Sequence, residues 1–291
     1  MSFVNNVFNV ARYWDGVVYG DLMLPLLERN IQPSQRPFAR AKAQKPEQFA
    51  VTTCAENPEF FDACVALENE IWEDLSFLEY TSAHHAHYDN LLARFPEFHM
   101  CVVEMGSGEL VATGTCVPLK IASDAVLPHE GWDWIVDTVQ SQNGAGANTL
   151  GALSVSVSKQ HRDLGLARDM IDAMRALAAR KKISKIIVPV RPSAKCDHPF
   201  VPMDQYVDWL DDRGRIFDPW LRSHVAVGGR IMGVCDRSMI VEQPVEFWKS
   251  WARGNLDQDG RVPVKGALAP VDIKAGVGRY VEPNVWVAHS V

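Results

Sequence analysis

Apolar and polar residues alternate along some stretches of this 291-residue chain and recur every three or four positions along others. Alternation predicts strands, because successive side chains of a strand point to opposite faces of a sheet. The predicted strands span 49–55, 99–105, 109–119, 149–157 and 185–190. Apolar residues at helical spacing predict helices at 58–75, 131–142 and 166–181. Strands interleaved with helices indicate an α/β (α+β) architecture, in which a mixed central sheet is flanked by helices.

The first 48 residues follow neither pattern. The stretch is locally basic, and four prolines interrupt any long element in it: Pro25, Pro33, Pro37 and Pro46. We therefore expect residues 1–48 to be an N-terminal extension that wraps the domain surface or packs on a partner subunit in a homodimer. Residues 49–291 are then expected to form the folded domain.

Composition and charge narrow the classes of partner. A net charge of −7 argues against a nucleic-acid surface, which needs clustered Lys and Arg. No apolar run approaches the roughly 20 residues that span a bilayer, so no membrane partner is expected. The six cysteines include no C-x-x-C pair, and the N-terminus lacks the basic region of a signal peptide. Free buried thiols in a cytoplasmic protein are the expectation.

The segment between the strand 149–157 and the helix 166–181 carries the strongest chemical signal. A helix N-terminus presents unpaired N–H groups and a partial positive charge, which together bind anions. Gly165 permits close approach of a ligand to the backbone, and Arg162 adds a charged donor at the rim. These features predict a phosphate site. A plain strand–turn–helix, in which the glycine only eases the turn, is the alternative reading.

The spacing of this segment resembles motif A of the GNAT superfamily of acyl-CoA-dependent N-acyltransferases, [RQ]-x-x-G-x-[GA]. The resemblance implies the GNAT fold, with acetyl-CoA or another acyl-CoA as co-substrate. It implies that the backbones of Val155 and Val157 bind the pantetheine arm. It also implies that the coenzyme A diphosphate is bound by the amides of six consecutive residues: Arg162, Asp163, Leu164, Gly165, Leu166 and Ala167.

A second stretch, residues 218–234, resembles the fourth helix and the sixth strand of the same fold, and 279–289 resembles its last strand. The family commonly has a catalytic tyrosine four residues before a glycine here, whereas this chain has His224 before Gly228. Imidazole titrates near neutrality, so we expect His224 to serve as the leaving-group acid, with Tyr206 as the rival. Tyr206 lies in an insertion at about 192–217, before the fourth helix, which we expect to shape the acceptor site.

The general base is not evident in the sequence. The fourth strand offers only Ser154, Ser156 and Ser158 where family members often place a glutamate. Glu104, a water chain, or an acceptor that needs no base remain as alternatives.

Two basic residues follow the strand 185–190, and a histidine-rich stretch lies earlier in the chain. Arg191 and Lys195 lie at a carboxyl strand end, where ligands bind in open sheets, so we expect them to contact substrate. His84, His85, His87 and Asp89 are close in sequence, but a metal site needs ligands at fixed geometry. No metal is expected.

The expected function is transfer of an acyl group, in the first place acetyl, from acyl-CoA to an amine of a small-molecule acceptor. Two alternatives remain. A GNAT-like decarboxylase acting on a malonyl-type thioester would use a histidine–hydroxyl pair, which serines facing His224 would supply. A catalytically degenerate GNAT fold would only bind coenzyme A or a partner.

Overall fold

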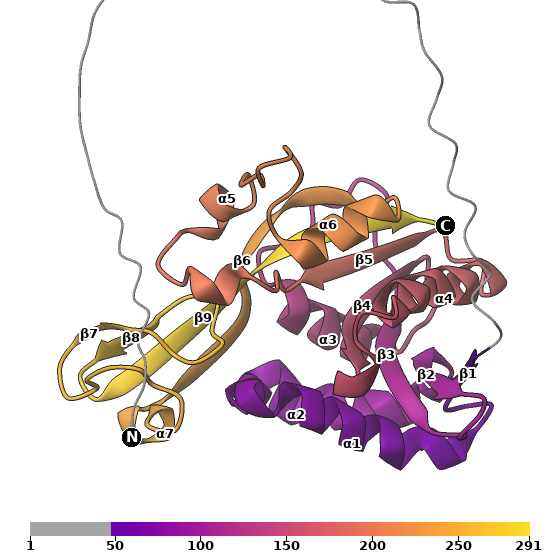
Figure 1. Cartoon of the computed structure of the whole chain (residues 1–291), viewed down its shortest axis with the longest axis horizontal. Helices are drawn as coiled ribbons and strands as arrows, with labels where there is room; N and C mark the ends of the chain where they lie inside the picture. Colours follow the sequence, from indigo (N-terminus) through magenta and orange to yellow (C-terminus); the bar gives the residue numbers. More distant parts are fainter. Residues whose placement is uncertain (1–47) are drawn as a thin grey trace, which may run out of the picture. The chain divides into compact units, whose positions relative to one another are not determined.

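A nine-stranded sheet runs through residues 48–291, the part of the chain that the computed structural model describes (Figure 1). The strand order is β1-β2-β3-β4-β5-β9-β8-β7, and β6 pairs with β9. Only β4 and β5 pair in parallel among these described strands, so the sheet is mixed, as the sequence predicted. The strands are β1 (Phe49–Thr53), β2 (His99–Glu104), β3 (Leu110–Leu119), β4 (Thr149–Val157), β5 (Lys185–Val190), β6 (Arg230–Pro244), β7 (Gly260–Val262), β8 (Val271–Lys274) and β9 (Val277–Ser290).

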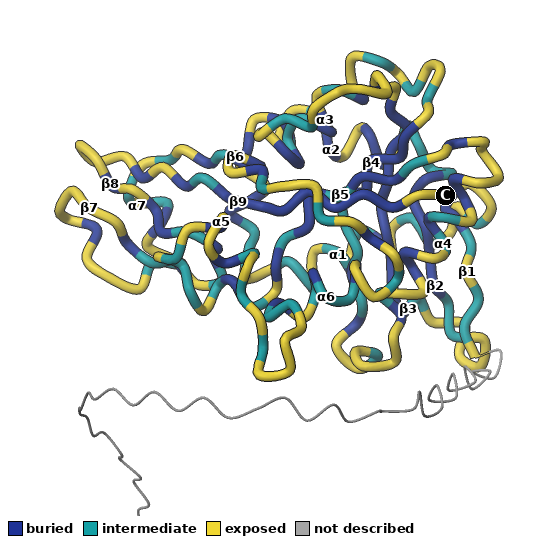
Figure 2. The backbone as a smooth tube through the Cα atoms, turned by 90° about the horizontal axis from the view of Figure 1, so that it is seen from above, coloured by how far each residue is buried: buried dark blue, intermediate teal, exposed yellow. Residues whose placement is uncertain are grey.

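The helices cover both faces of this sheet. They are α1 (Phe61–Trp72), α2 (Ser82–Arg94), α3 (Gly131–Gln142), α4 (Leu166–Arg180), α5 (Met203–Tyr206), α6 (Pro219–Ala226) and α7 (Val245–Trp248). Helix α4 forms because apolar residues recur along it at helical spacing, and this stripe is buried against β2–β5. Helices α2 and α3 bury their apolar residues in a second cluster with β6 and β9. Figure 2 shows the buried strands running between more exposed helices and loops.

Most elements of the central domain match their predictions. The predicted bounds of α3 and β4 are observed at both ends, and α4 ends one residue earlier than predicted. The predicted helix 58–75 ends as an α-helix at Trp72 and continues as a 3-10 segment, η2 (Glu73–Tyr80). Helices α2, α5 and α7 and strands β7 and β8 were not predicted from the sequence. Nothing is described of residues 1–47, so the predicted extension lies outside the described residues.

The C-terminal hairpin β6–β9 is the longest feature of the sheet. In Figure 1 its far end, with β7, β8 and α7, projects away from the central strands. The near end of β9 pairs with β5 and places His289 opposite Ile186 in the register. None of the described helices is long and apolar enough to span a membrane.

Candidate active site

The sheet opens between β4 and β5. These strands pair only through Thr149–Gly151 and Lys185–Ile187, and β4 then leaves its neighbour. Beside the opening, Leu153 has no partner on β3, because Ala152 faces Cys116 and Ser154 already faces Thr115. Such a bulge reverses which face the following side chains occupy. The Trp72 indole of α1 consequently donates a hydrogen bond to Ser156 Oγ at 2.9 Å.

A cavity of about 990 Å³ passes through this opening. Ala167, Ile171 and Met174 of α4 line one side of it. Residues of α1, η2 and α2 line the other side, including Glu68, Glu79 and Asp89. The cavity is therefore accessible to ligand groups from both faces of the sheet.

The turn into α4 has the geometry of an anion site. Gly165 is the N-cap of α4, with a φ of 82°, and no side chain caps the helix end. Asp163 also has a positive φ, of 68°, so the turn is tight. Leu166 is buried, whereas Arg162 to Gly165 are exposed. The N-terminal amides of a 15-residue helix, with their partial positive charge, are thus open to a ligand.

The strand before this turn has one free backbone edge. Val155 and Val157 pair on one side with Gly114 and Ala112 of β3. Among the described strands they have no partner on the other side, because β5 has already separated. Peptide groups on that edge are available to a ligand in the opening, and Val155 lines the cavity.

His224 lies at the cavity as the inner member of a histidine pair. Arg175 Nη2 donates to His289 Nδ1 at 3.2 Å, and His224 Nδ1 lies 3.0 Å from His289 Nε2. Arginine can only donate, so His289 carries its proton on Nε2 and donates to His224. The His224 proton is therefore on Nε2, a buried atom without a hydrogen-bond partner in the described structure.

Burial keeps this pair neutral. It lowers the pKa of His224 to about 3, with a further contribution from His289, and lowers that of His289 to about 4, where Arg175 adds to the effect. The prediction from the sequence that His224 titrates near neutrality is therefore wrong, because burial lowers its pKa. At neutral pH His224 presents an N–H donor to the cavity. The adjacent Gly229 permits this packing, since a Cβ there would lie 2.7 Å from His289 Cε1.

The opposite wall of the cavity is acidic. Glu68 and Glu79 were not singled out from the sequence, and Asp89 was considered only as a metal ligand. Glu68 Oε1 accepts a hydrogen bond from the Tyr88 hydroxyl at 2.8 Å. Burial raises the pKa of Glu68, against the opposing effect of the Ser154 and Tyr88 hydroxyls. The pKa of Glu79 is also raised, first by burial and then by the negative charges of Asp89 and Glu68. No ion pair engages these three carboxylates within residues 48–291.

One signal in the sequence pointed to Glu68. It falls on the apolar stripe of α1, four residues after the buried Cys64 and four before Trp72. A carboxylate on the buried face of a helix is rare unless it has a function or a partner. Glu104, the carboxylate named from the sequence, instead accepts a hydrogen bond from Ser107 in the β2–β3 turn and does not line the cavity.

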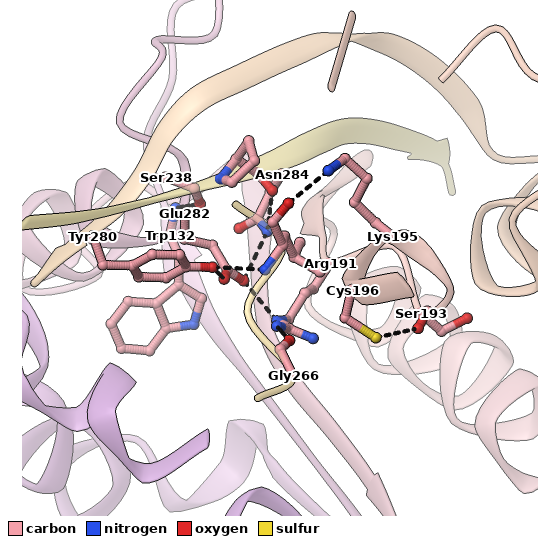
Figure 3. A network of polar contacts seen from close by, with 12 residues as sticks. Trp132, Arg191, Ser193, Lys195, Cys196, Ser238, Gly266, Tyr280, Glu282 and Asn284 are labelled. Atoms are coloured by element: carbon pink, nitrogen blue, oxygen red, sulfur yellow. Dashed lines mark hydrogen bonds and ion pairs between the residues drawn. The ribbon is translucent and has the colours of Figure 1, made fainter. Parts of the chain in front are cut away.

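The predicted substrate-binding residues separate in the structure. Arg191 lines the cavity, and its guanidinium bonds Glu282 Oε1 at 2.7 Å and the Gly266 carbonyl at 2.5 Å (Figure 3). Lys195 is fully buried away from the cavity lining. Its Nζ donates to the Leu268 carbonyl at 2.6 Å, and burial lowers its pKa to about 8.

Tyr206, the rival acid, lies outside the cavity lining. Its hydroxyl donates to Asp218 Oδ2 at 3.1 Å, and its ring packs with Trp209 and Phe217. Burial and the Asp218 charge raise its pKa. The structure therefore brings His224 and Arg191 to the same cavity and leaves Tyr206 and Lys195 behind it.

Comparisons with known proteins show the family and the fold of the chain. The chain is 32% identical over 279 residues to the arginine N-acetyltransferase avaD of Aspergillus versicolor, across 84% of this chain and 95% of that protein. Its fold is similar to the loading GNATL domain of CurA from Lyngbya majuscula (TM-score 0.54, 13% identity, 83% of this chain and 97% of that one). It is also similar to the GNAT-like decarboxylase GphF in complex with isobutyryl-CoA (TM-score 0.50, 16% identity, 83% and 98%). No family model matches the chain.

The open β4–β5 edge, the uncapped helix turn and the cavity beside them form a site open to a ligand. The chain belongs to the GNAT superfamily, as the resemblance of its turn segment indicated. It is an acyl-CoA-dependent N-acyltransferase.

Proposed function

We propose that this enzyme transfers an acetyl group from acetyl-CoA to the α-amine of arginine or of a closely similar guanidinium compound. The acidic wall of Glu68, Glu79 and Asp89 is the observation that carries the proposal. Like charges in one cavity repel. Burial is the main cause of the raised pKa of Glu79, and the charges of Asp89 and Glu68 raise it further. A bound cation relieves this repulsion. The relative from Aspergillus versicolor, named an arginine N-acetyltransferase, has an acceptor with the required charge.

In the proposed complex, coenzyme A lies on the α4 side of the sheet. The backbones of Val155 and Val157 pair with the pantetheine arm along the free edge of β4. The turn amides from Arg162 through Ala167 hold the diphosphate, with the Arg162 guanidinium at the rim. The observed uncapped N-terminus of α4 and its opening onto the cavity at Ala167 support this placement.

The acceptor enters from the α1–α2 side. Glu68 accepts the proton of the substrate ammonium, and its raised pKa brings it closer to the pH at which it works. The amine nitrogen then bonds to the thioester carbon, the C–S bond breaks, and the coenzyme leaves as a thiol or thiolate. Glu68 releases the first proton to solvent, and the second amine proton then protonates the departing thiolate. His224 donates its Nε2–H to the negative charge that develops during attack.

The two ends of the acceptor meet different charges in this arrangement. Glu79 and Asp89 hold the guanidinium. Among the described residues that line the cavity, Arg191 is the single lysine or arginine. Its guanidinium binds the carboxylate of the amino acid. The ion pair with the buried Glu282 fixes the Arg191 guanidinium in place. The insertion at 192–217 contributes Ser193 to the same end of the cavity.

The acidic wall disfavours the decarboxylase alternative. A malonyl thioester would bring a carboxylate into a cavity that is already lined by four of them, of which only Glu282 is paired with a cation in the described structure. Ser156 is also engaged by the Trp72 indole rather than by His224.

The test compares acceptors that differ by one group. With acetyl-CoA, arginine is expected to give free thiol and N-acetylarginine, detected by thiol release and mass spectrometry. Citrulline keeps the shape of arginine but lacks the positive charge of the guanidinium. Agmatine keeps the guanidinium but lacks the carboxylate. The KM for each of these two acceptors is expected to be at least tenfold higher than the KM for arginine. Equal turnover of citrulline and arginine would contradict the role of the acidic wall, and CO₂ release from malonyl-CoA without an amine would establish the decarboxylase.

We place the enzyme in the cytoplasm. In support, all six cysteines are free thiols, as expected in a reducing compartment. The homodimer expected from residues 1–48 stays a prediction, checked by light scattering on the full chain.

A further inference from the structure

Three cysteines from separate elements meet beneath the first strands of the sheet. Cys54 follows β1, Cys64 lies on α1, and Cys101 lies on β2. The Sγ–Sγ distances are 3.4 Å for Cys64–Cys101, 3.6 Å for Cys54–Cys101 and 4.0 Å for Cys54–Cys64. Each of the three side chains is at most 2% exposed. The cluster lies outside the cavity lining, and the proposed acyl transfer does not use it.

His99 adds a nitrogen to this cluster. It is fully buried on β2, two residues before Cys101, so the two side chains share a face of the strand. The Nδ1 atom is buried and has no hydrogen-bond partner in the described structure. The ligand atoms of Cys54, Cys64 and His99 all lie within 4.8 Å of one another, a set that does not include Cys101. Cys101 Sγ is instead close to the other two sulfurs.

The far side of the ring fixes where the His99 proton lies. His99 Nε2 is 3.1 Å from Thr113 Oγ1, and this hydroxyl donates its own hydrogen to the Met100 carbonyl, also at 3.1 Å. A hydroxyl has one hydrogen, so toward His99 it accepts, and the ring proton is on Nε2. The Nδ1 atom therefore carries a lone pair. Metal-ligating histidines have this arrangement, in which one nitrogen binds the metal and the other donates to a polar partner.

We propose that Cys54, Cys64, Cys101 and His99 Nδ1 bind one Zn²⁺ ion as a structural Cys₃His site. Zinc–sulfur bonds of about 2.3 Å in tetrahedral geometry separate sulfurs by about 3.8 Å, close to the observed separations. Binding of the ion would also draw Cys101 Sγ toward His99 Nδ1, because Cys101 lies outside the set of ligand atoms within 4.8 Å of one another. The fourth ligand is the nitrogen that has no other partner. Four protein ligands close the coordination sphere, so the site is structural rather than catalytic.

The zinc site would attach α1 to the β1–β2 edge of the sheet. Cys64 is one turn before Glu68 on α1, so the metal would also fix the helix that carries the proposed base. From the sequence alone, free thiols and no metal were expected at these positions. The ligands come from three elements, and no short motif joins positions 54, 64 and 101.

The first experiment measures metal in the unmodified full chain. Protein purified under reducing conditions without added chelator is expected to contain one zinc per chain by inductively coupled plasma mass spectrometry. Replacement by Co²⁺ is expected to give thiolate-to-cobalt charge-transfer absorption and the intense visible bands of tetrahedral cobalt. A chelator is expected to lower the Tm. Absence of zinc together with absence of cobalt bands, or a disulfide between any two of the three cysteines, would overturn the proposal.

The second experiment uses variants. Cys101→Ser is expected to abolish the stoichiometric zinc, whereas Cys116→Ser, a buried cysteine outside the cluster, is expected to keep it. Thr113→Val nearly preserves volume and removes the hydroxyl that bonds His99 Nε2 and the Met100 carbonyl. It is expected to weaken zinc binding about 10- to 100-fold while the chain still folds. Full zinc retention in Cys101→Ser would contradict the site. These readouts do not depend on acyl transfer, so they separate this proposal from the proposed function.

Discussion

The two ends of the cavity are built from different parts of the polypeptide. At the α4 end, the features that suit a coenzyme are backbone groups: the free edge of β4 and the uncapped N-terminus of α4. At the α1–α2 end, the features that suit an acceptor are side chains from three elements, among them Glu68, Glu79 and Asp89. The first end occupies about a dozen consecutive residues. The second is assembled across more than twenty, on elements that meet only in the folded chain.

This difference explains what each end can tolerate. A backbone site is insensitive to most side-chain changes, but it is blocked by any group that fills the space before the amides. A side-chain site changes its specificity when one carboxylate is neutralised, while the fold persists. Substitutions at the α4 end should therefore affect coenzyme binding, and those at the α1–α2 end should affect turnover and choice of acceptor.

The largest expected effect is at Gly165. Gly165→Asp places a negative charge before the α4 amides and is expected to abolish stabilisation by acetyl-CoA and all activity. In the unmodified enzyme, coenzyme at about 100 times its Kd should add about 2.7 kcal/mol to stability, measured by thermal shift. Gly165→Asn is the control, since it has the same size and equal tolerance of positive φ without the charge. If the two variants bind equally, the diphosphate is not at this turn.

The next largest effect is at Glu68. Glu68→Gln is expected to lower kcat about 100- to 10,000-fold, the usual contribution of a general base, with little change in acetyl-CoA binding. Glu70→Gln is the matched control, on the same helix but exposed and paired with Lys159. The base works when ionised, so wild-type kcat should fall as pH decreases through a pKa above 4.5. If Glu68→Gln shows the same fall of kcat at low pH, the titrating group is not Glu68.

His224→Phe is expected to lower kcat about 100-fold or more, because a hydrogen-bond donor to the developing negative charge is lost. His129→Phe, at an exposed histidine outside the cavity, is the control. The lowered pKa of His224 also affects stability. The unfolded chain takes up this proton near pH 6.5 and the folded chain only near pH 3, so stability is lost as pH falls between these values. The Phe variant should lose less stability over this range in urea titrations.

Arg162 has the smallest expected effect. Arg162→Ala should weaken acetyl-CoA binding by roughly 1–3 kcal/mol, as loss of a charge-assisted hydrogen bond would. Arg180→Ala, at the opposite end of α4, should leave binding unchanged. Added salt should weaken coenzyme binding to the wild type more than to Arg162→Ala, because exposed charges are screened. Equal salt dependence would remove Arg162 from the coenzyme site.

Local pattern was enough for the central elements of the fold. The period of the apolar residues predicted α3, β4 and α4 closely, since each buries one regular stripe or face. It did not predict the bulge at Leu153, because a bulge depends on the pairing with β3. It also did not predict β7 and β8, which have only three and four residues and are held by β9.

The sequence by itself determined the central strands and helices, the family motif and the turn at Gly165, because these depend on neighbours close along the chain. Only the tertiary structure decided which charged and polar groups meet. It buried His224 against His289, 65 residues away, and this burial keeps His224 neutral. It gathered the acidic wall, left Lys195 buried on carbonyls, and joined Cys54 to Cys101 across 47 positions. The physical reason is that ionisation and coordination depend on burial and distance, and neither is fixed until the elements pack.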